Sequence, residues 1–559
     1  MTVSKQSISS GKMLLRFALP LLILAVPGWS QEVVRILDGE FSYTLTEVDA
    51  IADVDGDGVD DHFLWGFGSP AFQGSLVHVY SGLTGVKLWS TSGGALHSSI
   101  PTVSCADADS VVLGDFDGDG DEDVAVGCPR VNTGESEVFI LDGSTGVELL
   151  RITDPFDVFG RHLGAPGDTN GDGYADLLVA DMVGNQRLYL GPNGSASYSL
   201  QGPAQTFLGA NCIGDIDFDG GDDFALGWGL TGLITIHSGM TGVQLGHACT
   251  FDSSSCGGAY GLQMAALGDV NEDGVPDFAA SSFNVILPGG HGGVGMARII
   301  SGADFSTIHE VPGRPGPDSD FLGAHLGGGH DINGDGVKDI VVRNGFSSNF
   351  AVTAISGRTG QILYQARPEY AGGILETFDD FVGVSTVPDI NGDGFAEWTV
   401  ACPFADFGGV LAGRVFILGG GPGDVEHVCD ASPNSIGVKA RLHFYGAITA
   451  EGDGLEVRID DGPPHAFAFL LYGPRDAPIP VGDGTLCINS SSIVRFGAPI
   501  QFDGTGYVTK AVDWSTSPIG LGPSEWAAGS SWTVQSIFRD ANTVSGFNTT
   551  NAIEVTINE

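Results

Sequence analysis

Seven short stretches of this chain place oxygen-bearing side chains at alternate positions, a pattern that can hold a hard cation. Each stretch has nine residues, with an acid at position 1, Asp or Asn at position 3, Asp at position 5, Gly at position 6 and an acid at position 9. Calcium accepts six to eight oxygen ligands in flexible geometry, and the backbone carbonyl at position 7 can supply one of them. The spacing therefore predicts up to seven Ca²⁺ ions.

The predicted metal ligands, loop by loop, are Asp53, Asp55, Asp57, Val59 and Asp61; Asp115, Asp117, Asp119, Asp121 and Asp123; Asp168, Asn170, Asp172, Tyr174 and Asp176; Asp215, Asp217, Asp219, Gly221 and Asp223; Asp269, Asn271, Asp273, Val275 and Asp277; Asp331, Asn333, Asp335, Val337 and Asp339; and Asp389, Asn391, Asp393, Phe395 and Glu397.

Three alternatives to calcium loops are weighed against this pattern. An EF-hand needs a Glu at position 12, whereas every copy has an apolar residue there, from Leu64 in the first to Val400 in the last. An ordinary Asp-Gly turn explains one copy, but crowded carboxylates without a cation would repel one another. Zinc and copper are disfavoured because the donors are all oxygens. The fourth loop, with Phe218 at position 4, and the seventh, ending in Glu397, are predicted to be the weakest.

The loops recur every 47 to 62 residues, and the intervening sequence predicts β-strands. An apolar run such as Val124 to Val126 follows each loop, as expected of a strand buried on both faces. A glycine turn such as Ser81 to Gly85 follows further on in several copies. One four-stranded sheet per copy predicts a closed, seven-bladed β-propeller over residues 31–423. The last copy is one strand short, so we expect residues 32–37 to complete the seventh blade.

The order of loop, buried strand and Phe-Gly element, as in Phe159-Gly160, resembles the FG-GAP repeat family, the propeller repeats of integrin alpha subunits and of many secreted bacterial proteins. The resemblance covers roughly residues 32–423. It implies a seven-bladed propeller with calcium in its loops, and extracellular binding or adhesion by the loops at the opposite end. The Phe-Gly element is degraded in most copies.

Composition restricts the possible partners and the compartment. The formal net charge of −46 argues against nucleic acid and against anionic membrane surfaces, because both require clustered basic residues. Residues 1–30 combine basic residues, a short apolar run and small residues before a possible cleavage point, which predicts a secretory signal peptide. We therefore expect a protein that is secreted, or at the cell surface or in the periplasm, without membrane insertion.

Eight cysteines in an exported chain permit disulfides. The candidate pairs are Cys249 with Cys256 and Cys429 with Cys487. Cys128 and Cys402 occupy equivalent places on different repeats and are not expected to pair with each other.

Residues 424–559 contain no acidic loop, and the glycine-rich stretch 419–423 is interpreted as a linker. Seven strand-like runs between residues 438 and 557 predict a small β-sandwich. This segment resembles a C-terminal module of secreted bacterial repeat proteins, and that resemblance implies no particular function.

No hydrolase, metalloprotease or nucleotide-binding motif is present, and no catalytic residue is assigned. His162 and His325 precede their loops by the same offset and can line the channel, although repetition alone explains this match. His291 and His330 are weaker candidates. The favoured function is a non-enzymatic, calcium-stabilised module for an extracellular protein or glycan ligand. The alternatives are a carbohydrate-binding lectin propeller and a polysaccharide-acting hydrolase or lyase on the same scaffold.

Overall fold

The computed structural model describes residues 33–38, 43–68, 75–92, 109–129, 136–154, 159–181, 185–201, 207–228, 232–249, 263–283, 285, 294–313, 322–345, 352–366, 383–402, 414–421, 425–429, 431–445, 456–504, 506–511 and 530–556. These residues form 39 β-strands and contain no helix. The prediction of an all-β fold is confirmed. The predicted signal peptide, residues 1–30, and Cys256 of one predicted disulfide lie outside the described residues.

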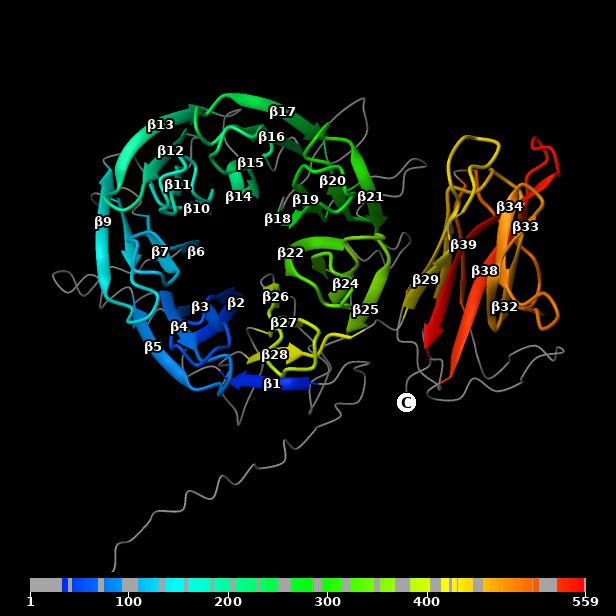
Figure 1. Ribbon diagram of the computed structural model, residues 1–559, viewed down its shortest axis with the longest axis horizontal. Helices are drawn as coiled ribbons and strands as arrows, with labels where there is room; N and C mark the ends of the chain where they lie inside the picture. Colours follow the sequence, from blue (N-terminus) through cyan, green and yellow to red (C-terminus); the bar gives the residue numbers. More distant parts are fainter. Residues whose placement is uncertain are drawn as a thin grey trace, which may run out of the picture.

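Strands β1 to β28 form seven sets of four strands arranged in a ring (Figure 1), and a short parallel pairing joins the third and fourth sets into one eight-stranded sheet. We call each set a blade and number the blades along the chain. Blade 1 contains β2 (Tyr43–Ile51), β3 (Asp61–Gly68), β4 (Ser75–Tyr80) and β5 (Lys87–Ser92). Blade 2 contains β6 (Ser110–Gly114), β7 (Asp123–Cys128), β8 (Ser136–Leu141) and β9 (Glu148–Asp154). Blade 3 contains β10 (His162–Ala165), β11 (Leu177–Ala180), β12 (Asn185–Leu190) and β13 (Ser195–Gln201).

The remaining blades repeat this order. Blade 4 contains β14 (Phe207–Gly214), β15 (Asp223–Trp228), β16 (Leu233–His237) and β17 (Gln244–Cys249). Blade 5 contains β18 (Gln263–Gly268), β19 (Asp277–Ser282), β20 (Met296–Ile300) and β21 (Thr307–Pro312). Blade 6 contains β22 (Leu322–His330), β23 (Asp339–Asn344), β24 (Val352–Ile355) and β25 (Ile362–Ala366). Blade 7 contains β26 (Val384–Val387), β27 (Glu397–Cys402), β28 (Arg414–Leu418) and β1 (Val33–Asp38).

The N-terminal strand closes the ring. Strand β1 pairs antiparallel with β28, from Val33 opposite Leu418 to Asp38 opposite Arg414. This pairing confirms the prediction that a strand preceding the first loop completes the last blade. It also covers the edge of β28 and gives blade 7 a fourth, outer strand, as in the other blades.

The apolar core lies between neighbouring blades. The second strand of each blade is buried on both faces, and position 12 of every repeat is no more than 2% exposed. One cluster joins Phe63 of blade 1 to Val126 and Phe139 of blade 2, and another joins Leu64 of blade 1 to Val415 of blade 7. The burial of position 12 confirms that this position faces a core.

Polar contacts also join several neighbouring blades at the outer strands. In three places an outer-strand side chain bonds a carbonyl in the glycine turn of the following blade: Trp89 Nε1 to Gly143 at 2.6 Å, the Tyr198 hydroxyl to Gly239 at 2.7 Å and His309 Nε2 to Arg358 at 2.8 Å. Arg35 on β1 makes the corresponding contact with Gly82 and Leu83 of blade 1. The N-terminal strand thus reproduces a contact made elsewhere in the ring.

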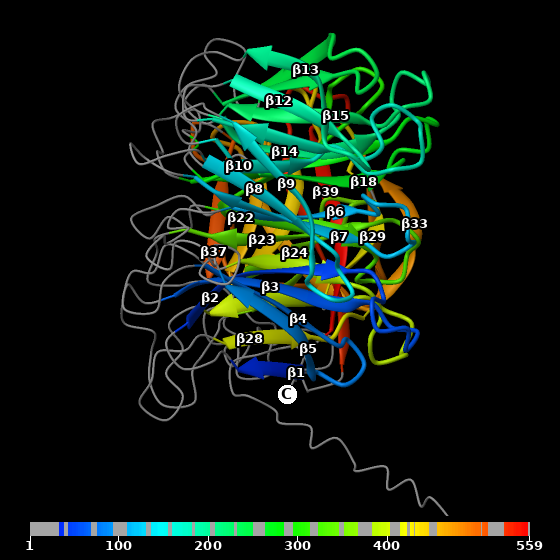
Figure 2. The same ribbon diagram turned by 90° about the vertical axis from the view of Figure 1, so that its left-hand side faces the viewer.

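The C-terminal strands form separate sheets beside the ring (Figures 1 and 2). The six-stranded sheet contains β29 (Val425–Cys429), β39 (Phe547–Thr556), β38 (Ser531–Arg539), β32 (Phe467–Gly473), β35 (Val494–Arg495) and β36 (Ile500–Gln501). The three-stranded sheet contains β30 (Arg441–Tyr445), β31 (Glu456–Asp460) and β37 (Val508–Ala511), and β33 (Arg475–Val481) pairs with β34 (Gly484–Ile488).

One apolar cluster holds the six-stranded and three-stranded sheets together, with Phe444 and Ile459 from one sheet and Leu470 and Phe538 from the other. The predicted disulfide between Cys429 and Cys487 is confirmed. Cys402 is free and Cys128 is disulfide-bonded, so these two do not pair with each other, as predicted. Strands β29, β33, β34 and β36 were not predicted.

Candidate metal centres

All seven acidic loops adopt the same conformation, which turns their oxygen atoms inward. The position 6 N–H donates to the position 1 carboxylate, at 2.7 Å in the loop with Gly58 and Asp53. The side-chain oxygen at position 3 accepts from the position 5 N–H, and the position 5 carboxylate accepts from the position 7 N–H. Short local bonds therefore hold the side chains at positions 1, 3 and 5 in the same arrangement in every loop.

Glycine is required at position 6 because the backbone there is left-handed in every loop, with φ between 84° at Gly336 and 102° at Gly120. Position 4 is left-handed too, and five loops have Gly there. The fourth and fifth loops instead have Phe218 (φ 60°) and Glu272 (φ 64°), side chains that rarely adopt this conformation. The fourth and fifth loops thus keep the left-handed backbone at position 4 although their residues there disfavour it.

The acid at position 9 is the most buried member of each loop, with an exposure of 1% or less in all seven. One of its oxygens accepts the position 2 N–H in every loop, at 2.8 to 3.0 Å. In six loops the other oxygen accepts a glycine N–H from the turn between the third and fourth strands, as Asp61 does from Gly82 at 2.8 Å. Position 9 therefore fixes the loop to its own blade.

The seventh loop differs at this position. Glu397 uses one oxygen to accept the Ile390 N–H, while its buried Oε1 has no hydrogen-bond partner. Burial raises the pKa of Glu397 to about 8. An orphaned carboxylate oxygen beside Asp389 and Asp393 is suited to a cation.

Burial also raises the pKa of the other position 9 acids: to about 6 for Asp61, Asp176 and Asp223, to about 7 for Asp123 and Asp339, and upward for Asp277. Carboxylates that are buried and crowded carry a desolvation cost that a bound cation would offset. The oxygen-only donor set and the raised pKa values both fit a hard divalent ion.

Four loops bring three carboxylates within 4.8 Å of one another: Asp53, Asp55 and Asp57; Asp115, Asp117 and Asp123; Asp215, Asp217 and Asp223; and Asp389, Asp393 and Glu397. The fourth and seventh loops, predicted to be the weakest, are among the four. Their weakness stays a prediction. The third, fifth and sixth loops have an Asn at position 3, as the seventh does with Asn391.

The inner strands of all seven blades line a central cavity of about 490 Å³. His325 and His330 of blade 6 line it, and so do Asp49 of blade 1 and Glu122 of blade 2. His162 is absent from this lining, and its Nδ1 lies 4.0 Å from Asp109 Oδ2. The structure therefore does not bring together the two histidines matched by sequence, and His291 lies outside the described residues.

Comparison with known proteins bears on the propeller. A model of the FG-GAP repeat matches residues 108–141. The chain is 28% identical over 250 residues to integrin alpha-PS2 of Drosophila melanogaster (42% of this chain, 15% of that protein) and 26% identical over 242 residues to integrin alpha-5 of Xenopus laevis (42% and 19%). It is 28% identical over 247 residues to human integrin alpha-IIb (38% and 24%).

The matched region thus spans between 15% and 24% of the length of these relatives. Among solved structures, the WD40 repeats of RRP9 match with a TM-score of 0.44 at 10% identity, covering 69% of this chain and 97% of that one. The ring therefore resembles the propellers of integrin alpha subunits, and residues 108–141 match the FG-GAP repeat.

Proposed function

We propose that this chain, whose ring is an integrin-alpha-like propeller with FG-GAP repeats, is an extracellular ligand-binding module stabilised by calcium. The supporting observation is the loop conformation itself, which is shared by seven segments of different sequence and brings three carboxylates within 4.8 Å of one another in four of them. In this conformation the carboxylates of each loop repel one another. A bound cation would compensate for that repulsion in all seven loops.

In each loop the calcium ion would be held by the side chains at positions 1, 3, 5 and 9 and by the carbonyl at position 7. A bound ion supplies positive charge that offsets the repulsion among these acids. The protein's own contribution is to hold the oxygens in place before binding, through the glycine at position 6 and the buried acid at position 9. The role of calcium here is structural, because the loops join strands and the strands form the interblade core.

We propose that the propeller spans residues 31–423 and the C-terminal module residues 424–559, and that ligands bind at the end of the ring opposite the acidic loops. The protein would be secreted, or held at the cell surface or in the periplasm. Among the described residues no helix is long and apolar enough to cross a membrane. A protein or glycan ligand suits an exported binding module of this kind.

Chelation provides the direct test. An ion that binds only the folded form adds about 2.7 kcal/mol per site when its concentration is a hundredfold above Kd. Removing calcium from several sites is therefore expected to lower the melting temperature by about 10 °C or more, as measured by calorimetry. Readdition of calcium restores the transition.

The matched control is an exposed carboxylate outside the loops. Asp476 lies on the exposed strand β33, and Asp476→Asn should leave the calcium-dependent shift unchanged. A melting curve that is the same in chelator and in calcium would show that the loops are ordinary acidic turns.

A lectin is the second candidate, and it is favoured by a pocket at the end opposite the loops whose lining combines hydrogen-bonding and apolar side chains. A polysaccharide-acting enzyme would instead release new reducing or unsaturated ends from its substrate. Glycan binding without such products would support the lectin over the enzyme.

A further inference from the structure

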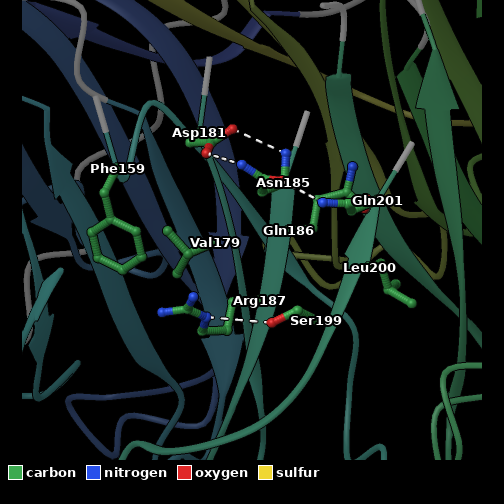
Figure 3. Close-up of a pocket in the computed structure, with 9 residues that line it drawn as sticks. All are labelled: Phe159, Val179, Asp181, Asn185, Gln186, Arg187, Ser199, Leu200 and Gln201. Carbon is green, nitrogen blue, oxygen red and sulfur yellow. Dashed lines mark hydrogen bonds between the residues drawn. The ribbon is translucent and has the colours of Figure 1, made fainter. Parts of the chain in front are cut away.

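Blade 3 has a pocket of about 260 Å³ at the end opposite its acidic loop (Figure 3). Strand β11 begins directly after that loop and ends at Ala180, so Asp181 and the start of β12 lie one strand length away from the predicted calcium. The pocket is lined by residues of β11, β12 and β13, together with Phe159, which precedes β10. It therefore lies at the end where we propose that ligands bind.

The charged groups of the pocket already have partners within the protein. The guanidinium of Arg187 forms an ion pair with Asp154, which is 5% exposed, and its Nε donates to Ser199 Oγ at 3.4 Å. The carboxylate of Asp181 is also 5% exposed and accepts from the Asn185 backbone N–H at 2.9 Å and from Asn185 Nδ2 at 2.6 Å. Both carboxylate oxygens of Asp181 and the guanidinium of Arg187 thus already have hydrogen-bond partners, so a charged ligand would have to displace one of these contacts, which is costly.

Neutral polar groups continue this network to the surface. Asn185 Oδ1 accepts from Gln201 Nε2 at 3.2 Å, so a carboxylate and two amides form a continuous chain across β11, β12 and β13. An amide has two N–H donors and a hydroxyl can both donate and accept. The second N–H of Asn185, the O–H of Ser199 and the carbonyl of exposed Gln201 thus offer two donors and one acceptor to a ligand.

Apolar side chains complete the wall. Phe159 and Val179 are 3% and 1% exposed and present carbon surface beside the polar chain. The volume corresponds to about eight or nine water molecules at ~30 Å³ each, which suits one small ring better than an extended peptide. The ligand should therefore be compact, uncharged and rich in hydroxyls, with one apolar face.

We infer that this pocket binds a single neutral monosaccharide unit, such as the terminal residue of a glycan. This inference rests on the proposed function as a ligand-binding module and specifies the class of ligand. It does not depend on calcium occupancy, because no predicted metal ligand lines the pocket.

Blade 5 shows that the pocket is no automatic product of the repeat. Arg298 holds the register position of Arg187, and Glu310, which pairs with it at 2.7 Å, holds that of Ser199. Ser282 and Met296 stand where blade 3 has Asp181 and Asn185. Blade 5 thus repeats the guanidinium of blade 3. It lacks the hydrogen-bonded chain of one carboxylate and two amides that blade 3 has.

The test uses the full-length, calcium-loaded chain and saturation-transfer NMR with four probes: neutral hexoses, neutral N-acetylhexosamines, hexuronic acids and arginine amide. At least one neutral sugar is expected to bind. Ser199→Ala and Gln201→Ala change exposed residues, so both variants should fold, and each should weaken binding two- to tenfold through the loss of one neutral hydrogen bond. Glu310→Ala, at the blade 5 position that matches Ser199, should leave the affinity unchanged.

Three results would overturn the inference: no neutral sugar binds at tens of millimolar, neither blade 3 variant weakens binding, or a charged probe binds with sensitivity to these variants while the neutral sugars do not. Failure of the calcium proposal is separable. In that case chelation leaves the melting curve unchanged while the sugar results stand or fall on their own.

Discussion

At the scale of single residues, position 9 of each loop has two separable roles. Asp123 accepts N–H groups from Phe116 at 2.9 Å, Asp117 at 3.2 Å and Gly143 at 3.2 Å, and is also a predicted calcium ligand. Asp119, at position 5 of the same loop, is exposed and accepts one N–H from Asp121. Asp123 therefore stabilises the blade as well as the loop, whereas Asp119 contacts the loop alone.

Substitution by asparagine should distinguish these roles. In Asp123→Asn the new side-chain NH₂ group replaces one acceptor oxygen, so at least one of the buried backbone N–H donors loses its acceptor. This loss is expected to lower the free energy of unfolding by about 1 to 3 kcal/mol. This loss should be seen in chelator as well as in calcium. Asp119→Asn keeps an acceptor oxygen and removes a repelling charge, so it should lower the melting temperature in calcium only.

Thermal melts of both variants, with and without chelator, provide the measurement. Equal destabilisation of the two variants in chelator would mean that the buried hydrogen bonds of position 9 contribute nothing of their own.

The loops were predictable from sequence because most of the signals that shape them lie within twelve consecutive residues. The acids, the glycine at position 6 and the apolar residue at position 12 are all local signals. The second bond of position 9 was not predicted, since its glycine partner lies 15 to 25 residues further along the chain. The glycine turn was visible in the sequence, but its N–H could not be assigned an acceptor.

The blade 3 pocket was missed for the same physical reason. Phe159, Asp181 and Gln201 come from three segments, and only strand register brings them together. Strand β33 was missed because it is exposed on both sides and contains Pro478 and Pro480, so it lacks the apolar pattern that predicts a strand.

At the scale of elements, neighbouring loops are joined by backbone bonds. The position 8 N–H of one loop donates to the position 1 carbonyl of the loop before it: Ala175 to Asp115 at 2.8 Å, Asp222 to Asp168 at 2.8 Å and Ala396 to Asp331 at 3.0 Å. The fifth loop has Pro276 at position 8, which has no N–H to donate. The third loop is thus bonded to both neighbours, whereas proline prevents this bond between the fourth and fifth.

These bonds predict that calcium sites affect their neighbours unequally. Asp172→Asn in the third loop should remove its own ion and weaken an adjacent site, because the shared bond holds the position 1 residue of the second loop. Asp273→Asn in the fifth loop should leave the fourth loop unaffected. Calcium titration with ion counting by native mass spectrometry measures both effects.

Independent sites would give a different result. Both variants would then lose one ion each, with the remaining affinities unchanged, and the backbone bonds would carry no coupling between loops.

At the scale of the whole molecule, a buried arginine joins the C-terminal sheets to the ring. Arg458 on β31 is 2% exposed, and its Nη1 donates to the carbonyls of Pro312 at 3.2 Å and Gly313 at 2.7 Å, at the end of blade 5. Its guanidinium also lies 4.7 Å from the centre of the Tyr507 ring. Removal of the charged group would leave buried carbonyls without this donor.

Arg458→Met is expected to lower the melting temperature of the C-terminal module by several degrees, for a loss of about 2 to 3 kcal/mol. The calcium-dependent transition of the propeller should stay in place. Arg495→Met is the control, because that guanidinium lies over Phe469 at 3.7 Å on an exposed strand end within the module. If calorimetry finds the same small decrease in melting temperature for both variants, the contact of Arg458 with blade 5 does not stabilise the module.

The pairing of β1 with β28 has a consequence for the order of events during biosynthesis. Val33 emerges from the ribosome long before its partner Leu418, so the first strand must wait through the synthesis of all the intervening blades. A contact between such distant segments forms late, since the chain entropy lost on closing a loop grows with its length. A nascent or truncated chain therefore has an incomplete seventh blade, and a chaperone that shields this edge would act longest on the first strand to be made.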